Sequence, residues 1–189
     1  MTDVNDLAAT GAEVRRRVGA ITAGQWDLST PCTDWTVTDL VVHLVEGSRM
    51  ALRLLEGASA SEARRAFGVA HGSDLAAELD VALAEELARF ESPDALTMTV
   101  HHPATGDIPG ATLLEFRTGD YLLHSWDLAR ATGGDEGLPE GLVATIWENL
   151  QPMAPFIGAI GVFGTGPSGT VAQGAPLAQR LLDLTGRRP

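Results

Sequence analysis

The sequence has few of the residues that build disulfide scaffolds, nucleic-acid interfaces or aromatic cores. It contains one cysteine, Cys32, no lysine, and only 5% aromatic residues in 189 positions. A single cysteine can form neither an internal disulfide nor a thiolate cage, so we expect a reducing compartment. All 13 basic residues are arginines, and the formal net charge is -12 at pH 7. Because this charge repels phosphate groups, we expect no nucleic-acid partner.

Long apolar segments are also missing. The longest apolar run, residues 152–164, is interrupted by Pro155, Gly158 and Gly161. It is shorter than the roughly 20 residues that a membrane-spanning helix needs. The first six residues are acidic and lack the apolar core of a signal peptide. We therefore expect a cytoplasmic protein with no membrane partner.

Leucine and alanine occur instead at the spacing typical of helices. With 44% hydrophobic and 20% charged residues the chain has a globular composition. Apolar periodicity, capping residues and Pro or Gly stops predict helices over residues 5–21, 36–56, 74–90 (capped by Ser73), 111–132 (ended by Gly133), 139 onward (bent at Pro152 and Pro155) and 176–185. We expect loops over 57–73 and 103–110, and at most one short strand or hairpin near 96–101. The predicted fold class is mainly all-α.

The chain is long enough for one compact domain. We expect a single domain over residues 1–189, with a helical bundle over about 5–161 and a tail over 162–189.

The helix predicted over 111–132 carries ionisable residues within its apolar face. At about 100° per residue, one face holds Leu113, Phe116, Asp120, Leu123, His124, Asp127, Leu128 and Ala131. A buried carboxylate needs an opposite charge, hydrogen bonds or a metal, because burying it alone costs several kcal/mol. Asp120 and His124 are four residues apart, so both can point at one divalent ion. The same spacing also arises by chance in many helices.

His43 is a third candidate ligand, on the helix predicted over 36–56. Gly47 follows one turn later, and a glycine inside a helix costs about 0.5–1 kcal/mol, which needs a reason. We expect Gly47 to leave room beside the imidazole of His43. The alternative is that His43 is a core histidine hydrogen-bonded to a neighbouring helix.

Four further residues are candidates for supporting or substrate-binding roles. Asp127 could orient an imidazole, or it could pair with Arg117 or Arg130. The arginines Arg49, Arg117 and Arg130 could bind the carboxylates of a thiol cofactor, or they could form ordinary surface ion pairs.

The remaining polar and aromatic candidates have simpler interpretations. We expect His71, His101 and His102 to be exposed in loops or at a strand edge. Trp126 is expected to serve packing. Cys32 is expected to be structural, because no base stands at a spacing that would activate its thiol.

Three stretches, residues 31–43, 120–133 and 175–189, together resemble an actinobacterial family. This family belongs with the mycothiol-dependent maleylpyruvate isomerase N-terminal domains in the DinB-like superfamily. The resemblance spans most of the chain. It implies a DinB-like four-helix bundle with extra C-terminal helices.

The resemblance also implies a metal centre and a function. The ligands carried onto this chain are His43, Asp120 and His124, which leave a coordination position open. The implied cofactors are a divalent metal, with Zn first and Ni, Fe or Mn as alternatives, and mycothiol. The expected function is a metal-dependent enzyme that activates a thiol or carbonyl of a small molecule, by thiol S-transfer, isomerisation, or a lyase or hydrolase step. The alternatives are a non-catalytic metal-binding or stress-associated module and a purely structural bundle that forms a homodimer.

Two differences from the isomerase bear on the reaction. Asp120 stands where the isomerase has a glutamate, which shortens the reach to the metal. The isomerase also has a second domain that helps to form its active site, and the predicted tail is too short to replace it. We therefore expect a reaction other than maleylpyruvate isomerisation.

Overall fold

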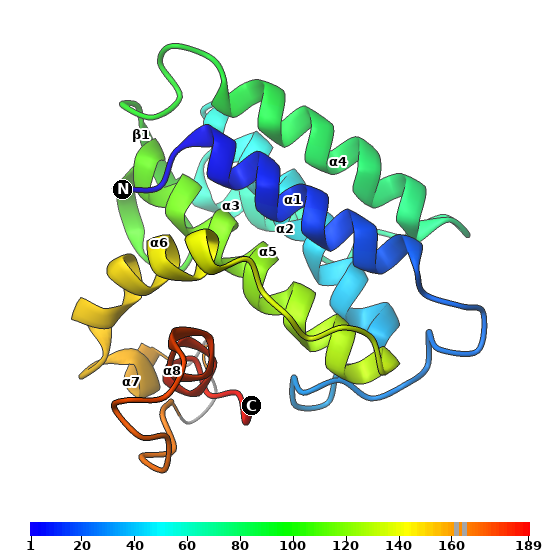
Figure 1. Cartoon of the computed structure of the whole chain (residues 1–189). Helices are drawn as coiled ribbons and strands as arrows, with labels where there is room; N and C mark the ends of the chain where they lie inside the picture. The colour runs from blue at the N-terminus through cyan, green and yellow to red at the C-terminus, as the bar shows by residue number, and fades with distance from the viewer. Residues whose placement is uncertain (161–162, 164–165) are drawn as a thin grey trace. The chain divides into compact units, whose positions relative to one another are not determined.

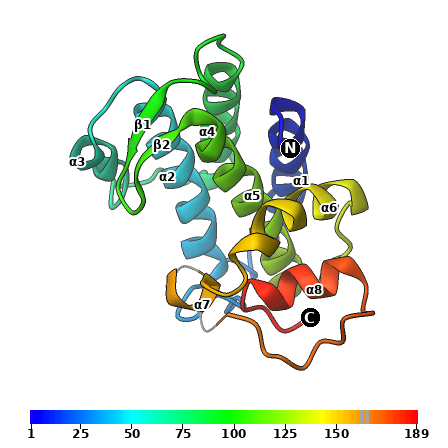
Figure 2. The same ribbon diagram turned by 90° about the vertical axis from the view of Figure 1, so that its left-hand side faces the viewer.

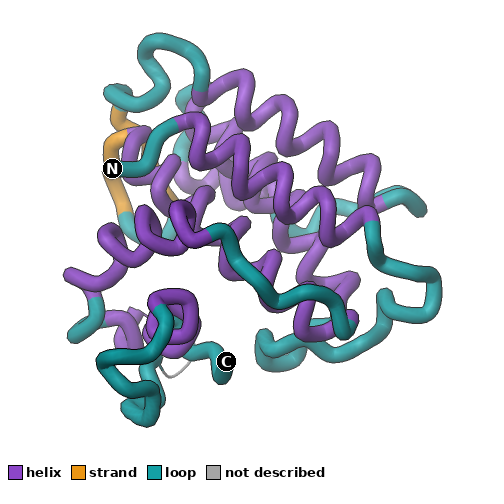
Figure 3. The backbone as a smooth tube through the Cα atoms, in the orientation of Figure 1, coloured by secondary structure: helices purple, strands orange, loops and turns teal. Residues whose placement is uncertain are grey.

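Helices make up most of the fold, with one two-stranded hairpin, as a computed structural model of the chain shows (Figures 1 and 3). The structure describes residues 1–160, 163 and 166–189. The helices are α1 (Val4–Gly19), α2 (Val37–Leu55), α3 (Ala60–Ala63), η1 (Arg64–Ala66), α4 (Leu75–Phe90), α5 (Gly110–Thr132), α6 (Glu140–Leu150), η2 (Gln151–Met153), α7 (Ile157–Ile160) and α8 (Leu177–Leu184). The strands are β1 (Thr99–His102) and β2 (Gly106–Pro109). The mainly all-α prediction is confirmed.

The chain divides into two compact units, residues 2–134 and residues 135–189. The single-domain expectation stays a prediction, and the boundary expected at residues 161 and 162 lies outside the described residues. None of the described helices is both long and apolar enough to cross a membrane.

The ends of the long helices follow their capping residues. A capping box between Thr36 and Asp39 starts α2, and Gly133 ends α5 with a left-handed φ of 69°, which a glycine adopts without strain. The predicted cap of α4 was wrong by one residue. Asp74 is the cap, because its side chain accepts a hydrogen bond from the backbone N–H of Ala77.

Helices α1, α2, α4 and α5 enclose the main apolar core of the first unit (Figure 2). α1 packs along α5, and α2 packs against both α4 and α5. The single apolar face predicted for α5 was too narrow. Leu114, Leu122 and Trp126 lie outside that face and are buried, whereas Phe116 on it is 41% exposed. The helix is thus covered on most sides, which brings its polar residues next to other helices.

Two predicted loops contain regular structure. Ser59 caps the short helix α3 through a capping box with Glu62, within the loop expected over 57–73. Strand β2 forms within the loop expected over 103–110 and pairs antiparallel with β1. The hairpin packs against α2, α3 and α5 (Figure 2).

In the second unit, α6 packs against α8, and the guanidinium of Arg180 lies 4.5 Å from the ring centre of Trp147. The helix expected from residue 139 onward, bent at Pro152 and Pro155, is divided: α6 ends at Leu150 and the 3-10 turn η2 containing Pro152 follows, because proline cannot donate a helical hydrogen bond.

Candidate metal centre

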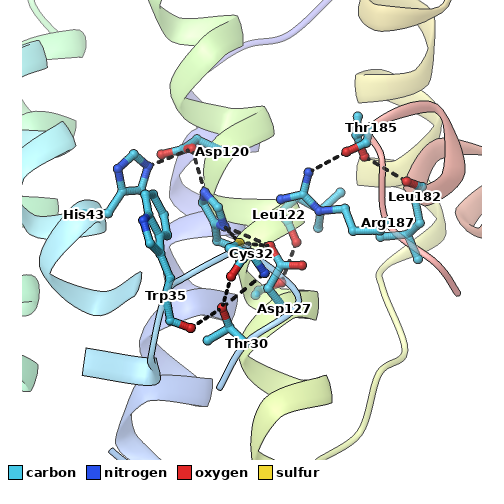
Figure 4. A network of polar contacts seen from close by, with 12 residues as sticks. Thr30, Cys32, Trp35, His43, Asp120, Leu122, Asp127, Leu182, Thr185 and Arg187 are labelled. Atoms are coloured by element: carbon cyan, nitrogen blue, oxygen red, sulfur yellow. Dashed lines mark hydrogen bonds and ion pairs between the residues drawn. The ribbon is translucent and has the colours of Figure 1, made fainter. Parts of the chain in front are cut away.

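Three predicted ligands converge from α2 and α5. Figure 4 shows two of them, His43 and Asp120, facing each other. The Oδ1 atom of Asp120 lies 3.3 Å from His43 Nε2 and 3.2 Å from His124 Nε2. All three donor atoms lie within 4.8 Å of one another. The side chain of His124 is 9% exposed, but those of His43 and Asp120 are 27% and 22% exposed. The site is therefore partly exposed to solvent on the side of His43 and Asp120.

Arg117 holds the other oxygen of Asp120. Its Nη1 lies 2.6 Å from Asp120 Oδ2, and its Nε lies 2.9 Å from Glu86 Oε1 on α4. Arg117 is buried, with 4% of its surface exposed. Because Arg117 binds Oδ2, Asp120 presents Oδ1 to the two imidazoles.

Gly47 makes room for Arg117 rather than for His43, which corrects the sequence-based interpretation. A Cβ atom at position 47 would lie 2.5 Å from Arg117 Nη1. Close packing of the guanidinium against α2 therefore accounts for the glycine.

A buried polar network fixes Arg117 from behind. Tyr121 donates to Glu86, and the hydroxyls of Tyr121 and Ser48 lie 2.6 Å apart. Burial raises the pKa of Glu86, although Arg117 and Tyr121 favour its ionised form. These contacts connect α2, α4 and α5 behind the site and restrict the movement of Arg117.

The pKa values of Asp120 and His124 are strongly shifted. Burial opposes ionisation of Asp120, but His43, His124 and Arg117 together hold its pKa well below the usual range. Burial opposes protonation of His124, but Asp120, Asp127 and Cys32 together hold its pKa well above the usual range. These contacts favour the ionised form of Asp120 and the protonated form of His124.

Asp127 contacts the other ring nitrogen of His124. Its Oδ2 lies 2.9 Å from His124 Nδ1, and the side chain is fully buried. This contact matches the prediction that Asp127 orients an imidazole. A carboxylate at Nδ1 fixes the orientation of the imidazole ring. The other ring nitrogen, Nε2, then faces Asp120.

Cys32 has a base beside it, contrary to the sequence-based expectation. Its Sγ lies 3.8 Å from His124 Nδ1 and 3.4 Å from Asp127 Oδ2. The two residues that it contacts follow it by more than 90 positions, so local spacing held no signal.

Trp35 is a site residue that sequence reasoning missed. Its ring centre lies 4.8 Å from that of His43 and 6.0 Å from that of His124. Figure 4 shows Trp35 beside His43. Its place directly before Thr36, the cap of α2, was the available signal. The indole forms an apolar wall beside both imidazoles.

The other two arginine candidates have different partners. Arg49 pairs with Glu78 at 2.8 Å, and Arg130 lies 4.6 Å from the ring centre of Trp126. Trp126 is 2% exposed, which fits the packing role predicted for it.

The predicted exposure of three histidines is only partly correct. His101 is 53% exposed, whereas His71 is 12% exposed and lies between Glu78 and Glu46. His102 is half-buried beside Phe116. Long-range partners that the local sequence does not reveal account for the burial of His71.

Comparison with known proteins identifies the family. Residues 7–129 match the family described as mycothiol maleylpyruvate isomerase N-terminal domain. The chain belongs to this family. His43, Asp120 and His124 all lie within the matched range.

Relatives with similar sequences occur in Mycobacterium tuberculosis. They are the uncharacterized proteins MT0763, of strain CDC 1551 / Oshkosh, and Rv0738, of strain H37Rv. Each is 34% identical over 138 residues, which cover 73% of this chain and 70% of the relative.

A crystal structure of a mutant mycothiol-dependent maleylpyruvate isomerase has a similar fold. The TM-score is 0.60 at 18% sequence identity. The match covers 75% of this chain but only 65% of the isomerase. This likeness of fold agrees with the family match.

Proposed function

We propose that this protein is a divalent-metal-dependent enzyme that activates a thiol or a carbonyl of a small molecule. His43, Asp120 and His124 hold the ion. The observation that carries the proposal is the convergence of two imidazole nitrogens on one carboxylate oxygen.

The donor set fits an ion such as Zn²⁺. Bonds of about 2.0–2.2 Å at tetrahedral angles separate nitrogen and oxygen ligands by about 3.3–3.5 Å. The separations of Asp120 Oδ1 from His43 Nε2 and His124 Nε2 are 3.3 and 3.2 Å. Three protein ligands leave a position for a substrate, as in catalytic rather than structural zinc sites.

When bound, such an ion lowers the pKa of a coordinated thiol or polarises a coordinated carbonyl. The residues of the chain prepare the site for this chemistry. Arg117 fixes the carboxylate of Asp120, Asp127 fixes the imidazole of His124, and Trp35 forms the apolar wall beside both imidazoles. These contacts hold the ligands in place before a metal binds, which reduces the cost of binding it.

The family supports mycothiol as the thiol. The matched family and the solved relative both carry mycothiol in their descriptions. We infer that mycothiol would be the thiol activated here, its S–H proton leaving to solvent as its sulfur bonds to a small electrophile, either permanently in S-transfer or reversibly in isomerisation. The partly exposed side of the site, at His43 and Asp120, is the side from which both molecules can enter.

Metal analysis of the purified protein tests the site. We expect one equivalent of Zn²⁺ per chain at this site, and His43→Ala and His124→Ala should each bind at least one equivalent less than the wild type. His101→Ala is the matched control, because this exposed histidine pairs with Asp107 on the hairpin. Metal retained in both ligand variants at the wild-type level would contradict the proposal.

Thiol activation has a separate readout. In the cobalt-substituted protein, mycothiol should shift the visible spectrum and add a thiolate-to-cobalt band. Mycothiol that leaves this spectrum unchanged would remove the thiol part of the proposal and leave the metal site standing.

A further inference from the structure

His124 has a second set of potential metal ligands on its other ring nitrogen. Around Nδ1 lie Asp127 Oδ2 at 2.9 Å and Cys32 Sγ at 3.8 Å, and these last two atoms are 3.4 Å apart. Neither Cys32 nor Asp127 belongs to the first ligand set. The two groups share only the imidazole of His124.

The three donors are spaced for a single ion. Zinc bonds of about 2.3 Å to sulfur and about 2.0–2.2 Å to nitrogen and oxygen place tetrahedral ligands about 3.3–3.6 Å apart. The three separations lie between 2.9 and 3.8 Å, so movements of a few tenths of an ångström would complete the site. A thiolate with an imidazole and a carboxylate favours a borderline or soft ion.

The loop before α2 holds Cys32 in place. The backbone N–H of Thr30 donates to Trp35 O at 2.9 Å, and that of Trp35 donates to Cys32 O at 3.1 Å. The hydroxyl of Thr30 accepts from the N–H of Cys32 at 3.1 Å. Asp34 completes the turn with a φ of 64°. A hydrogen-bonded turn thus presents the thiol to His124 rather than leaving it on a free loop.

Access and charge also suit a metal. Cys32 is half-buried, whereas Asp127 is fully buried, so an ion can approach past the sulfur. A buried carboxylate beside a thiol and an imidazole gains from a cation that all three can share.

We propose that Cys32, His124 Nδ1 and Asp127 form a second site, for a thiophilic divalent ion of the Zn²⁺ and Cd²⁺ class. On binding, the thiol and Nδ1 each release one proton to solvent, and three protein–metal bonds form. With both sites filled, the imidazole of His124 bridges two ions. This bridged state rests on the proposed function, but the second site itself does not, because it needs neither His43 nor Asp120.

Cadmium titration of the full chain tests the proposal. Thiolate-to-cadmium charge transfer absorbs in the ultraviolet, and Cys32 is the only cysteine, so this band reports on one sulfur. We expect two equivalents and the band in the wild type. We expect one equivalent and no band in Cys32→Ser, and one equivalent with the band kept in His43→Ala.

The variants separate the two sites. A wild type with no thiolate band, or a Cys32→Ser variant that binds as much cadmium as the wild type, overturns the second site. A His43→Ala variant that matches the wild type in stoichiometry contradicts the first site and leaves the second intact. His124→Ala should abolish the band together with binding at the first site, and a band of full strength in that variant would also overturn the proposal. Cooperative thermal unfolding of each variant checks that it is folded.

Discussion

Arg117 reaches Asp120 because the facing position on α2 has no side chain. The Cβ of an alanine at position 47 would lie 2.5 Å from Arg117 Nη1. The guanidinium cannot move away cheaply, because it is buried and paired with Glu86 and Asp120. We expect Gly47→Ala to lower the free energy of unfolding by about 1–3 kcal/mol, the usual cost of overpacking. Chemical denaturation measures this change, and zinc affinity should fall with it.

Gly11 on α1 provides the matched control. It is also a buried helical glycine, but an added Cβ would meet only Leu83 Cδ2, at 3.6 Å. Gly11→Ala should therefore be neutral or should stabilise the protein by up to about 1 kcal/mol through helix propensity. Equal stabilities of the two variants would show that Arg117 does not require the space at Gly47.

Asp127 sets the orientation of His124 through one charged contact. Asp127→Asn keeps the size of the side chain but removes the charge opposite Nδ1, at 2.9 Å. We expect zinc affinity at the first site to fall by about 10-fold to 100-fold, as for other losses of a carboxylate behind a ligating histidine. Competition with a chromophoric chelator measures this, in a Cys32→Ser background that removes the second site. Asp183→Asn, at a buried aspartate of the other unit, should leave the affinity unchanged.

At the scale of elements, Glu78 on α4 ties the loop before it to the helices. Its carboxylate accepts hydrogen bonds from the N–H of Gly72, from His71 Nδ1 at 3.0 Å and from Arg49 Nη2 at 2.8 Å. The Gly72 N–H, followed by His71 and Arg49, outweighs partial burial and lowers the pKa of Glu78. The sequence predicted a loop over residues 57–73. Hydrogen bonds to the ionised carboxylate of Glu78 thus hold the end of this segment against α4.

This contact makes part of the stability depend on pH. Because the pKa of Glu78 is lower in the folded protein, its contribution is full above the unfolded pKa and is lost as pH falls through the folded pKa. We expect Glu78→Gln to cost about 1 kcal/mol at pH 7, the scale of a hydrogen-bonded, partly exposed pair. The difference from the wild type should shrink below about pH 4.5 and then vanish. Denaturation at pH 7, 5 and 3 checks this, with the exposed Glu85→Gln as control; a pH-independent difference would contradict it.

The elements themselves were largely predictable, because their signals are local. Capping residues and apolar spacing located α1, α2 and α5 to within about two residues. Helix α3 was missed because its four residues have too few positions to show a period. Strand β2 was missed because Pro and Gly, which mark loops, also border tight hairpins.

The site was predictable only in part, because much of it depends on contacts between distant segments. Asp120 and His124 share a helix, so their spacing carried information. The link to His43 came from the family resemblance. Nothing in the spacing joined Cys32 to Asp127, or Gly47 to Arg117, because the first pair depends on a loop conformation and the second on how two helices pack. Trp35 likewise became a site residue only through the path of the loop that precedes α2.

At the scale of the whole molecule, the three proposed metal ligands all lie in the first unit. The main apolar core extends from Leu7 to Leu128, and the ligands and their supporting residues all lie within residues 2–134. We therefore predict that a chain ending at Gly134 folds cooperatively and binds one equivalent of zinc at His43, Asp120 and His124. Calorimetric unfolding with and without zinc measures this, since a ligand that binds only the folded state raises the melting temperature. A truncated chain without a cooperative transition would instead mean that residues 1–189 fold as one domain. In that case the second unit would be needed for the metal centre to form.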